Sequence, residues 1–112
     1  ASMAAGMSVA TLTVEDLKAL RDQRRPHVLL DVREPEEFEI ARISGALLIP
    51  LNQLSDRVDE LPNDKPILVY CHHGGRSAHA TAYLNRQGFS AHNVAGGIDA
   101  WSQRIDPSVP RY

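Results

Sequence analysis

One stretch of the sequence, residues 66–77, combines an apolar run, a lone cysteine, a glycine-containing turn and the start of a helix. The run at 67–70 (Ile-Leu-Val-Tyr) is short and rich in β-forming residues, which is typical of a strand buried on both faces. Cys71 follows this run directly and is the only cysteine of the chain. The pattern over 78–87 predicts a helix that Gly88 closes. A strand, a tight loop and a helix are therefore expected to converge on one thiol.

The surroundings that this pattern predicts for Cys71 favour a thiolate. A helix N-terminus offers unpaired N–H groups and a positive partial charge. Gly74 and Gly75 allow loop N–H groups to turn inward and form a concavity for an anion. Arg76 adds a permanent positive charge. We therefore expect a reactive nucleophile; the alternative is a buried structural cysteine.

The spacing of this loop resembles the active loop of the rhodanese family, which is Cys-x-x-x-x-Arg between a strand and a helix. Four residues separate Cys71 from Arg76. Residues 31–34 (Asp-Val-Arg-Glu) are similar to the family's Asp-x-Arg segment, and 96–101 to its Gly-Gly-x-x-x-Trp segment. Residues 41–46 (Ala-Arg-Ile-Ser-Gly-Ala) match a Gly-His-Ile-Pro-Gly-Ala segment of the family only in part. The resemblance runs from about Leu12 to Trp101.

The resemblance implies a sulfurtransferase of the thiosulfate type. Cys71 would be the catalytic nucleophile and would carry sulfane sulfur as a persulfide, taken from thiosulfate or a related small-molecule donor. The acceptor would be cyanide, a thiol or a sulfur-carrier protein, and no cofactor is implied. The loop that binds the substrate and the persulfide would consist of His72, His73, Gly74, Gly75, Arg76 and Ser77. Arg76 is expected to fix the loop and raise its positive potential, and Ser77 to cap the helix and to donate to the thiolate. Asp31 is expected to have a structural role.

Two other functions stay open at this point. A non-catalytic or regulatory binding module on the same fold is one, although such modules usually lack the cysteine. A cysteine-based phosphatase or arsenate reductase is the other, but the related phosphatases have five residues between Cys and Arg. As a sulfur donor, 3-mercaptopyruvate ranks below thiosulfate. The relatives that use it usually have Gly-Val-Thr where this loop has Gly-Arg-Ser at 75–77.

The histidines of the loop allow two interpretations. His72 and His73 either shape the pocket and add charge below about pH 6.5, or point to solvent while only their backbones matter. Together with Cys71 and His79 they could also suggest a metal site. Adjacent Cys-His-His does not match the usual ligand spacing and no second cysteine completes a set, so no metal is expected.

Apolar strand-like runs alternate with helical patterns along the chain, which predicts an α/β fold: a single domain with a mainly parallel central sheet and helices on both faces. The domain is expected over 9–112, with 1–8 a disordered segment or cloning remnant and 105–112 a tail extended on the surface or frayed. Strands are expected at 9–12, 27–32, 46–50, 67–70 and 92–94. Helices are expected at 14–23, 35–40, 52–61 (capped by Asn52), 78–87 and after 97, with Thr13 and Asp16 forming a capping box.

The composition limits the partners. A net charge of −2 leaves no basic excess, so neither nucleic acid nor a membrane surface is expected as a partner. No apolar run approaches the length of a bilayer span. A single cysteine excludes an internal disulfide, and a thiol that must stay reduced favours the cytoplasm.

Overall fold

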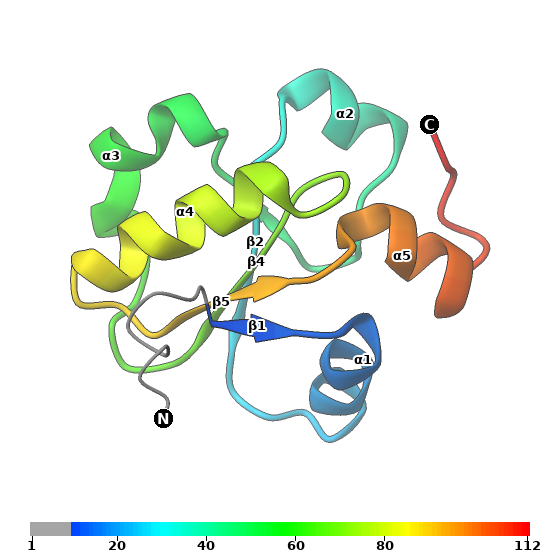
Figure 1. The fold of residues 1–112 in the computed structure, drawn as a ribbon, viewed down its shortest axis with the longest axis horizontal. Helices are drawn as coiled ribbons and strands as arrows, with labels where there is room; N and C mark the ends of the chain where they lie inside the picture. The colour runs from blue at the N-terminus through cyan, green and yellow to red at the C-terminus, as the bar shows by residue number, and fades with distance from the viewer. Residues whose placement is uncertain (1–9) are drawn as a thin grey trace.

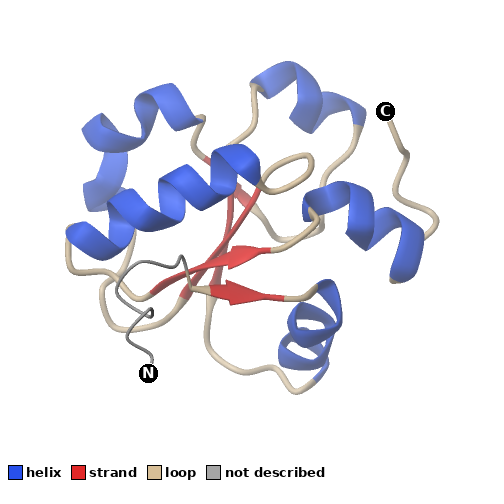
Figure 2. Cartoon of the chain, in the orientation of Figure 1, coloured by secondary structure: helices blue, strands red, loops and turns tan. Residues whose placement is uncertain are grey.

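A computed structural model of the chain describes residues 10–112 and has an α/β fold (Figures 1 and 2). Five strands form one sheet in the order β1-β5-β4-β2-β3, and every neighbouring pair is parallel. The strands are β1 (Thr11–Leu12), β2 (Val28–Asp31), β3 (Leu47–Leu48), β4 (Ile67–Tyr70) and β5 (Ala91–Val94). The helices are α1 (Val14–Asp22), α2 (Pro35–Ile40), α3 (Leu54–Arg57), α4 (Gly75–Arg86) and α5 (Gly97–Arg104), with 3-10 turns at Leu51–Gln53 and Val58–Glu60.

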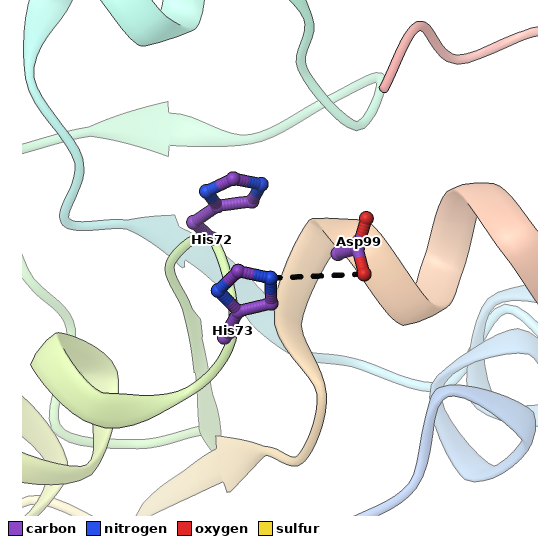
Figure 3. A group of neighbouring side chains, drawn as sticks. All are labelled: His72, His73 and Asp99. Atoms are coloured by element: carbon purple, nitrogen blue, oxygen red, sulfur yellow. Dashed lines mark ion pairs between the residues drawn. The ribbon is translucent and has the colours of Figure 1, made fainter. Parts of the chain in front are cut away.

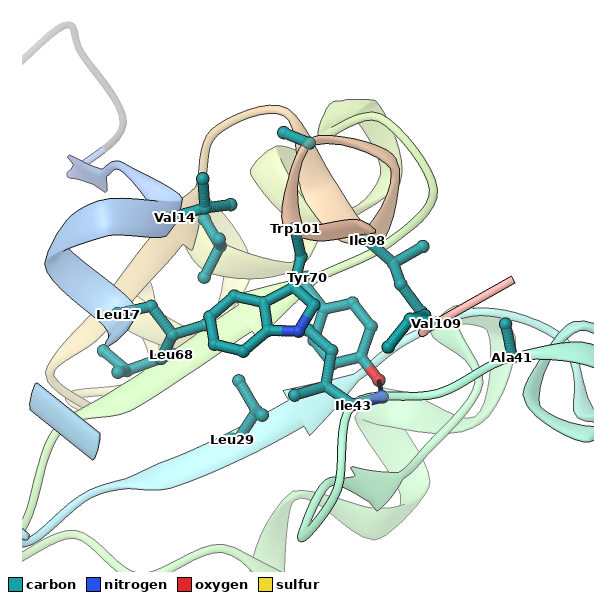
Figure 4. Close-up of a cluster of buried hydrophobic side chains, with 12 residues drawn as sticks. Val14, Leu17, Leu29, Ala41, Ile43, Leu68, Tyr70, Ile98, Trp101 and Val109 are labelled. Carbon is teal, nitrogen blue, oxygen red and sulfur yellow. Dashed lines mark hydrogen bonds between the residues drawn. The ribbon is translucent and has the colours of Figure 1, made fainter. Parts of the chain in front are cut away.

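The central strand β4 separates two hydrophobic clusters, because successive side chains of a strand point to opposite faces of the sheet. Leu68 and Tyr70 pack with Trp101 in the cluster beneath α1 and α5, which Figure 4 shows. Val69 packs with Leu84 in the cluster beneath α3 and α4. All four residues of β4 are buried, as predicted for a strand covered on both faces. Each face of the sheet therefore has its own layer of helices.

The parallel arrangement brings the carboxyl ends of all strands to one edge of the sheet. Asp31 ends β2, Cys71 follows β4, and a glycine turn follows β5 before α5 begins. The amino ends of α4 and α5 lie at the same edge (Figure 1). Ligands of open parallel sheets bind at this edge, where the strand order changes direction.

Several predicted elements have different bounds in the structure. The third strand is two residues long and lies at the edge of the sheet, where Leu47 is 36% exposed, so the predicted strand over 46–50 is too long. The helix expected over 52–61 is a short α-helix between two 3-10 turns, and Asn52 does not cap it. Helix α4 begins at Gly75 rather than at 78, because Gly74 is its N-cap.

Other local predictions are confirmed. Thr13 and Asp16 form the capping box of α1, with both of its hydrogen bonds 3.0 Å long. Gly88 follows α4 with a φ of +95°, the conformation that favours glycine.

The tail is not frayed. Val109 is buried and its carbonyl accepts a hydrogen bond from Ser102 Oγ at 2.5 Å. The chain then continues along α5 toward the edge where Cys71 lies (Figure 1). No helix within 10–112 is long and apolar enough to cross a bilayer. The expectation for residues 1–8 lies outside the described residues, as does the first position of the strand predicted at 9–12.

Candidate active site

Cys71 lies directly after β4 and only 2% of its surface is exposed. Its carbonyl accepts a hydrogen bond from the Ile98 N–H at 2.9 Å. The next carbonyl, that of His72, accepts one from the Asp99 N–H at 3.1 Å. Both donors belong to the first turn of α5, whose N–H groups have no partner within the helix. The start of α5 therefore holds the two residues that lead from the strand into the loop.

Gly97 is required where α5 passes this backbone. Its φ is +61°, and a Cβ built there would lie 2.4 Å from the His72 carbonyl oxygen and 2.5 Å from that of Cys71. Both neighbours are backbone atoms, which cannot move aside without displacing the loop. The Gly-Gly pair at 96–97 is thus explained by close packing against the cysteine loop, by which we mean residues 71–77.

The sulfur of Cys71 faces two backbone donors. The N–H of Gly74 donates to Sγ at 3.2 Å and the N–H of Ser77 donates at 3.3 Å. Gly74 has a φ of +121°, which lets the loop turn back so that the first turn of α4 opens toward the sulfur. The predicted concavity of inward N–H groups is therefore present at these two residues.

Both expectations for the Ser77 side chain are wrong: it does not cap the helix, and its hydroxyl donates to Asn93 and not to the sulfur. Ser77 is the third residue of α4, and its hydroxyl donates to Asn93 Oδ1 at 2.6 Å while its oxygen lies 3.3 Å from the Cys71 sulfur. Asn93 extends from β5 and is almost completely buried. The side chain of Ser77 therefore connects the nucleophile to the neighbouring strand.

Arg76 turns toward α2. Its guanidinium pairs with Glu37 at two points, Nη1–Oε1 at 2.6 Å and Nη2–Oε2 at 2.9 Å. The hydrogen bonds from Arg76 hold the pKa of Glu37 down at about 2, against the effect of burial. The same pair raises the pKa of Arg76. Arg76 fixes the loop as expected, and its charge is balanced by a carboxylate.

Asp31 and Arg33 form a fully buried ion pair beside this network. Asp31 Oδ2 accepts from Arg33 Nη2 at 2.7 Å, and Oδ1 accepts from both the backbone N–H and Nε of Arg33. Burial acts to lower the pKa of Arg33, but the hydrogen bonds that its guanidinium donates to Asp31 and Tyr112 outweigh burial and raise that pKa. Asp31 contacts no residue of the cysteine loop through these bonds, which agrees with a structural role.

Tyr112 brings the tail into the same network. Its hydroxyl accepts from Arg33 Nη1 at 2.7 Å and donates to Glu37 Oε2 at 2.8 Å. Its ring stacks on that of His72, with centroids 4.1 Å apart and planes 11° apart. Burial raises the pKa of Tyr112 to about 12, so the hydroxyl keeps its proton as a donor to Glu37. The tail therefore contacts the cysteine loop directly.

The rings of His72 and His73 are stacked on each other at 4.1 Å, and Figure 3 shows them beside Asp99. His73 is 71% exposed at its side chain, with Nε2 3.7 Å from Asp99 Oδ2. Burial, followed by the neighbouring His73, lowers the pKa of His72. His72 is therefore a packed residue of the rim, whereas His73 projects toward solvent. The packing of His72 agrees with the interpretation that it shapes the pocket, although its lowered pKa argues against added charge near pH 6.5, and the exposure of His73 agrees with the interpretation that it points to solvent.

The residues that could hold a metal ion in the structure differ from the set of ligands that the sequence suggests. Within the described chain, His72, His73 and Asp99 have ligand atoms within 4.8 Å of one another, and Cys71 and His79 do not belong to this group. Asp99 already binds Arg111 at 3.0 Å and Gln103 at 2.8 Å. The stacked rings face each other, whereas a metal binds a ring nitrogen in the plane of the ring. Both imidazoles would have to rotate to share an ion.

His79 lies apart from the loop. It lines a hollow of about 250 Å³ together with Leu51, Leu54, Ser55, Tyr83 and Arg86. No residue of the cysteine loop lines this hollow. His79 therefore takes no part in the site around Cys71.

Three residues of the site were missed by the sequence analysis: Glu37, Asn93 and Tyr112. Glu37 lies among other glutamates on and beside α2, and the sequence does not distinguish it from them. Asn93 and Tyr112 lie far from Cys71 in the sequence, and the parallel sheet and the ordered tail bring them to it.

The comparisons with known proteins agree on one family. The Rhodanese-like domain model matches residues 13–104, and the chain belongs to this family. A rhodanese-like domain protein of Staphylococcus aureus superposes with a TM-score of 0.81 at 30% identity, covering 92% of this chain and 98% of that one. The range matched by the family model includes strands β2 to β5 and the cysteine loop.

Curated relatives include proteins named as sulfurtransferases. The chain is 41% identical over 88 residues to the thiosulfate sulfurtransferase GlpE of Pseudomonas syringae pv. syringae, covering 78% of this chain and 81% of that protein. It is 38% identical over 106 residues to the probable adenylyltransferase/sulfurtransferase MoeZ of Mycobacterium tuberculosis, covering 92% of this chain and 27% of that protein. The chain spans 30% or less of the first curated relatives it matches.

Proposed function

We propose that this protein is a sulfurtransferase with Cys71 as its nucleophile. The observation that supports this best is the buried sulfur, which receives the N–H groups of Gly74 and Ser77 in a loop with four residues between cysteine and arginine. A loop of this size suits one sulfur atom better than a phosphate. Relatives named as sulfurtransferases support the same class.

The proposed donor is thiosulfate or another small sulfane compound. The Cys71 thiolate attacks the outer sulfur of thiosulfate, a new S–S bond forms, and the old S–S bond breaks with its electron pair leaving on sulfite. The enzyme is left as a persulfide anion. A nucleophile such as cyanide, a thiol or a sulfur-carrier protein then attacks the outer sulfur and releases the Cys71 thiolate. This sequence needs no cofactor, and its two half-reactions predict ping-pong kinetics.

The chain's own groups have distinct parts in this proposal. The N–H groups of Gly74 and Ser77 stabilise negative charge on sulfur without having to reorganise, and one lost donor of this kind typically raises a barrier by about 3 kcal/mol. The start of α4 adds its positive partial charge. Arg76 keeps the loop in place through Glu37. A thiol that must stay reduced between turnovers favours a reducing compartment such as the cytoplasm.

Steady-state transfer from thiosulfate to cyanide tests the proposal. Thiocyanate should form with parallel double-reciprocal lines, and Cys71→Ser should abolish it while keeping the circular dichroism of the folded protein. Full activity of that variant would contradict the assignment. Turnover of an aryl phosphate without formation of thiocyanate would favour the phosphatase hypothesis. The absence of both activities in the folded protein would favour a binding module.

A further inference from the structure

Asn93 contacts the two residues that donate to the sulfur. Its Nδ2 donates to the Gly74 carbonyl at 3.2 Å, and its Oδ1 accepts from the Ser77 hydroxyl at 2.6 Å. The backbone N–H groups of the same two residues donate to Cys71 Sγ. One side chain on β5 therefore holds both residues that supply donors to the nucleophile.

The partners of Asn93 fix the direction of each bond. The Gly74 carbonyl can only accept, so the amide NH₂ must face it and Oδ1 must face Ser77. The hydroxyl of Ser77 has one proton, and that proton goes to Oδ1 at 2.6 Å. The Ser77 oxygen then presents a lone pair to the sulfur 3.3 Å away. The donors left for a thiolate are the two backbone N–H groups.

The sheet does not need the side chain of Asn93. The backbone of this residue pairs with Val69 in β4 and with Thr11 in β1, and its N–H donates to the Ala10 carbonyl at 2.7 Å. These bonds place β5 whatever side chain stands at 93. The Gly74 carbonyl also has a second donor, the Ala78 N–H at 3.0 Å. The side-chain bonds of Asn93 are therefore available to act on the cysteine loop.

We propose that Asn93 is a positioning residue for Cys71: it holds Gly74 and Ser77 so that both of their N–H groups point at the sulfur. Asn93 does not touch the sulfur itself. The consequence for turnover rests on the proposed sulfurtransferase function, but the effect on the thiolate does not.

Asn93→Leu tests this inference, because leucine has the same branched shape and number of side-chain heavy atoms as asparagine and can make neither hydrogen bond. The pH dependence of the ultraviolet absorbance of the thiolate reports on Cys71 alone, since the chain has one cysteine. In an otherwise wild-type protein the freed Ser77 hydroxyl would turn its proton to the sulfur, so this variant and its control are made in a Ser77→Ala parent. In that parent we expect Asn93→Leu to raise the midpoint by up to about one pH unit, the size expected when hydrogen bonds to a charged sulfur are weakened. Persulfide formation measured below the midpoint, where the thiolate fraction limits the rate, should fall in proportion, by up to about tenfold.

Asn85→Leu is the matched control. Asn85 also makes two side-chain bonds to backbone groups, both to Ala91 at the opposite end of β5, at 3.0 Å and 2.8 Å. In the same Ser77→Ala parent this variant should lose some stability and keep the thiolate midpoint of the parent. Should Asn93→Leu fail to fold, Asn93→Ser serves instead, because its short side chain cannot reach both partners and should raise the midpoint in the same way.

Two results would overturn the inference. One is a folded Asn93 variant, in the Ser77→Ala parent, whose thiolate midpoint equals that of the parent. The other is an equal rise in the Asn85 and Asn93 variants, which would indicate general loosening. A raised midpoint in a protein that forms no persulfide would uphold the inference and contradict the proposed function.

Discussion

The guanidinium of Arg76 and the carboxylate of Glu37 meet at two points, 2.6 and 2.9 Å apart, and join the cysteine loop to α2. Two-point arginine–carboxylate pairs fix orientation as well as charge. The arginine of the loop is thus held from outside the loop, and its partner is held in turn by Tyr112. This chain of contacts leads to the first two predictions.

Glu37→Gln should destabilise the protein at neutral pH and not at acid pH. The pKa of Glu37 is lowered from 4.5 to about 2, so its ionised form stabilises the fold above pH 4.5 and loses this effect as the pH falls toward 2. We expect a loss of about 1–2 kcal/mol at pH 7, because Arg76 is partly exposed and its charge is screened. Urea unfolding from pH 7 down to pH 2 measures this loss of stability and its disappearance in acid.

The control for this prediction is Glu39→Gln. Glu39 is an exposed glutamate on the same helix and should show no such dependence. A constant difference in stability between wild type and Glu37→Gln across the pH range would contradict the role of the ion pair.

Tyr112→Phe and Tyr112→Leu should separate the two contacts of the tail. Phenylalanine keeps the ring stacked on His72 but lacks the hydroxyl that joins Arg33 to Glu37. Tyr112→Phe should therefore lower the free energy of unfolding by about 1 kcal/mol. Leucine loses the stack as well, with a further loss of about 0.5–1 kcal/mol. Chemical denaturation measures both losses, and the His72 ring resonances should move only in the leucine variant. Equal stabilities of all three proteins would show that the tail is not docked.

Gly97→Ala should displace the cysteine loop. The new methyl group would meet the carbonyl oxygens of Cys71 and His72 at 2.4–2.5 Å, in a backbone conformation that already favours glycine. We expect a loss of about 2–4 kcal/mol and impaired sulfur transfer, since only backbone movement can relieve the contact. Gly88→Ala is the control, because it has a φ of +95° but open space around it, and it should lose about 1 kcal/mol with transfer intact. Similar effects of the two changes would argue against close packing at 97.

The two histidines should differ when each is replaced by alanine. His72 stacks on both His73 and Tyr112, so His72→Ala should lose about 1 kcal/mol, whereas His73→Ala should lose little. The pKa of His72 is lowered in the fold, so the fold prefers the neutral ring, and this contribution fades as the pH falls below about 6.5. Thermal unfolding of both variants between pH 8 and pH 5 measures the difference. A greater loss from His73→Ala would contradict the stacked arrangement.

The sequence predicted the parts of the fold that depend on local pattern. The apolar run at Ile67–Tyr70 and the glycine turn after it have local causes, and both are where the pattern indicated. The predicted length of β3 was wrong because the length of a strand depends on the strands that pair with it. Leu47 lies at the edge of the sheet, and among residues 10–112 β3 pairs with β2 alone.

The candidate site was predictable around Cys71 and much less so beyond the loop. Residues 71–77 are contiguous, so their spacing in the sequence indicates their arrangement. Glu37, Asn93 and Tyr112 come from other elements and meet the loop only after the sheet and the tail have formed. Ser77 was assigned as a helix cap on local grounds, but the partner of its hydroxyl is on β5.

The most direct test of the account is the mass of the intact protein after incubation with thiosulfate, followed by a chase with cyanide. We predict a gain of one sulfur, about 32 Da, that cyanide removes and that Cys71→Ser does not show. An unchanged mass with thiosulfate and with a persulfide donor, in a protein that is folded and reduced, would contradict the claim that Cys71 carries sulfur.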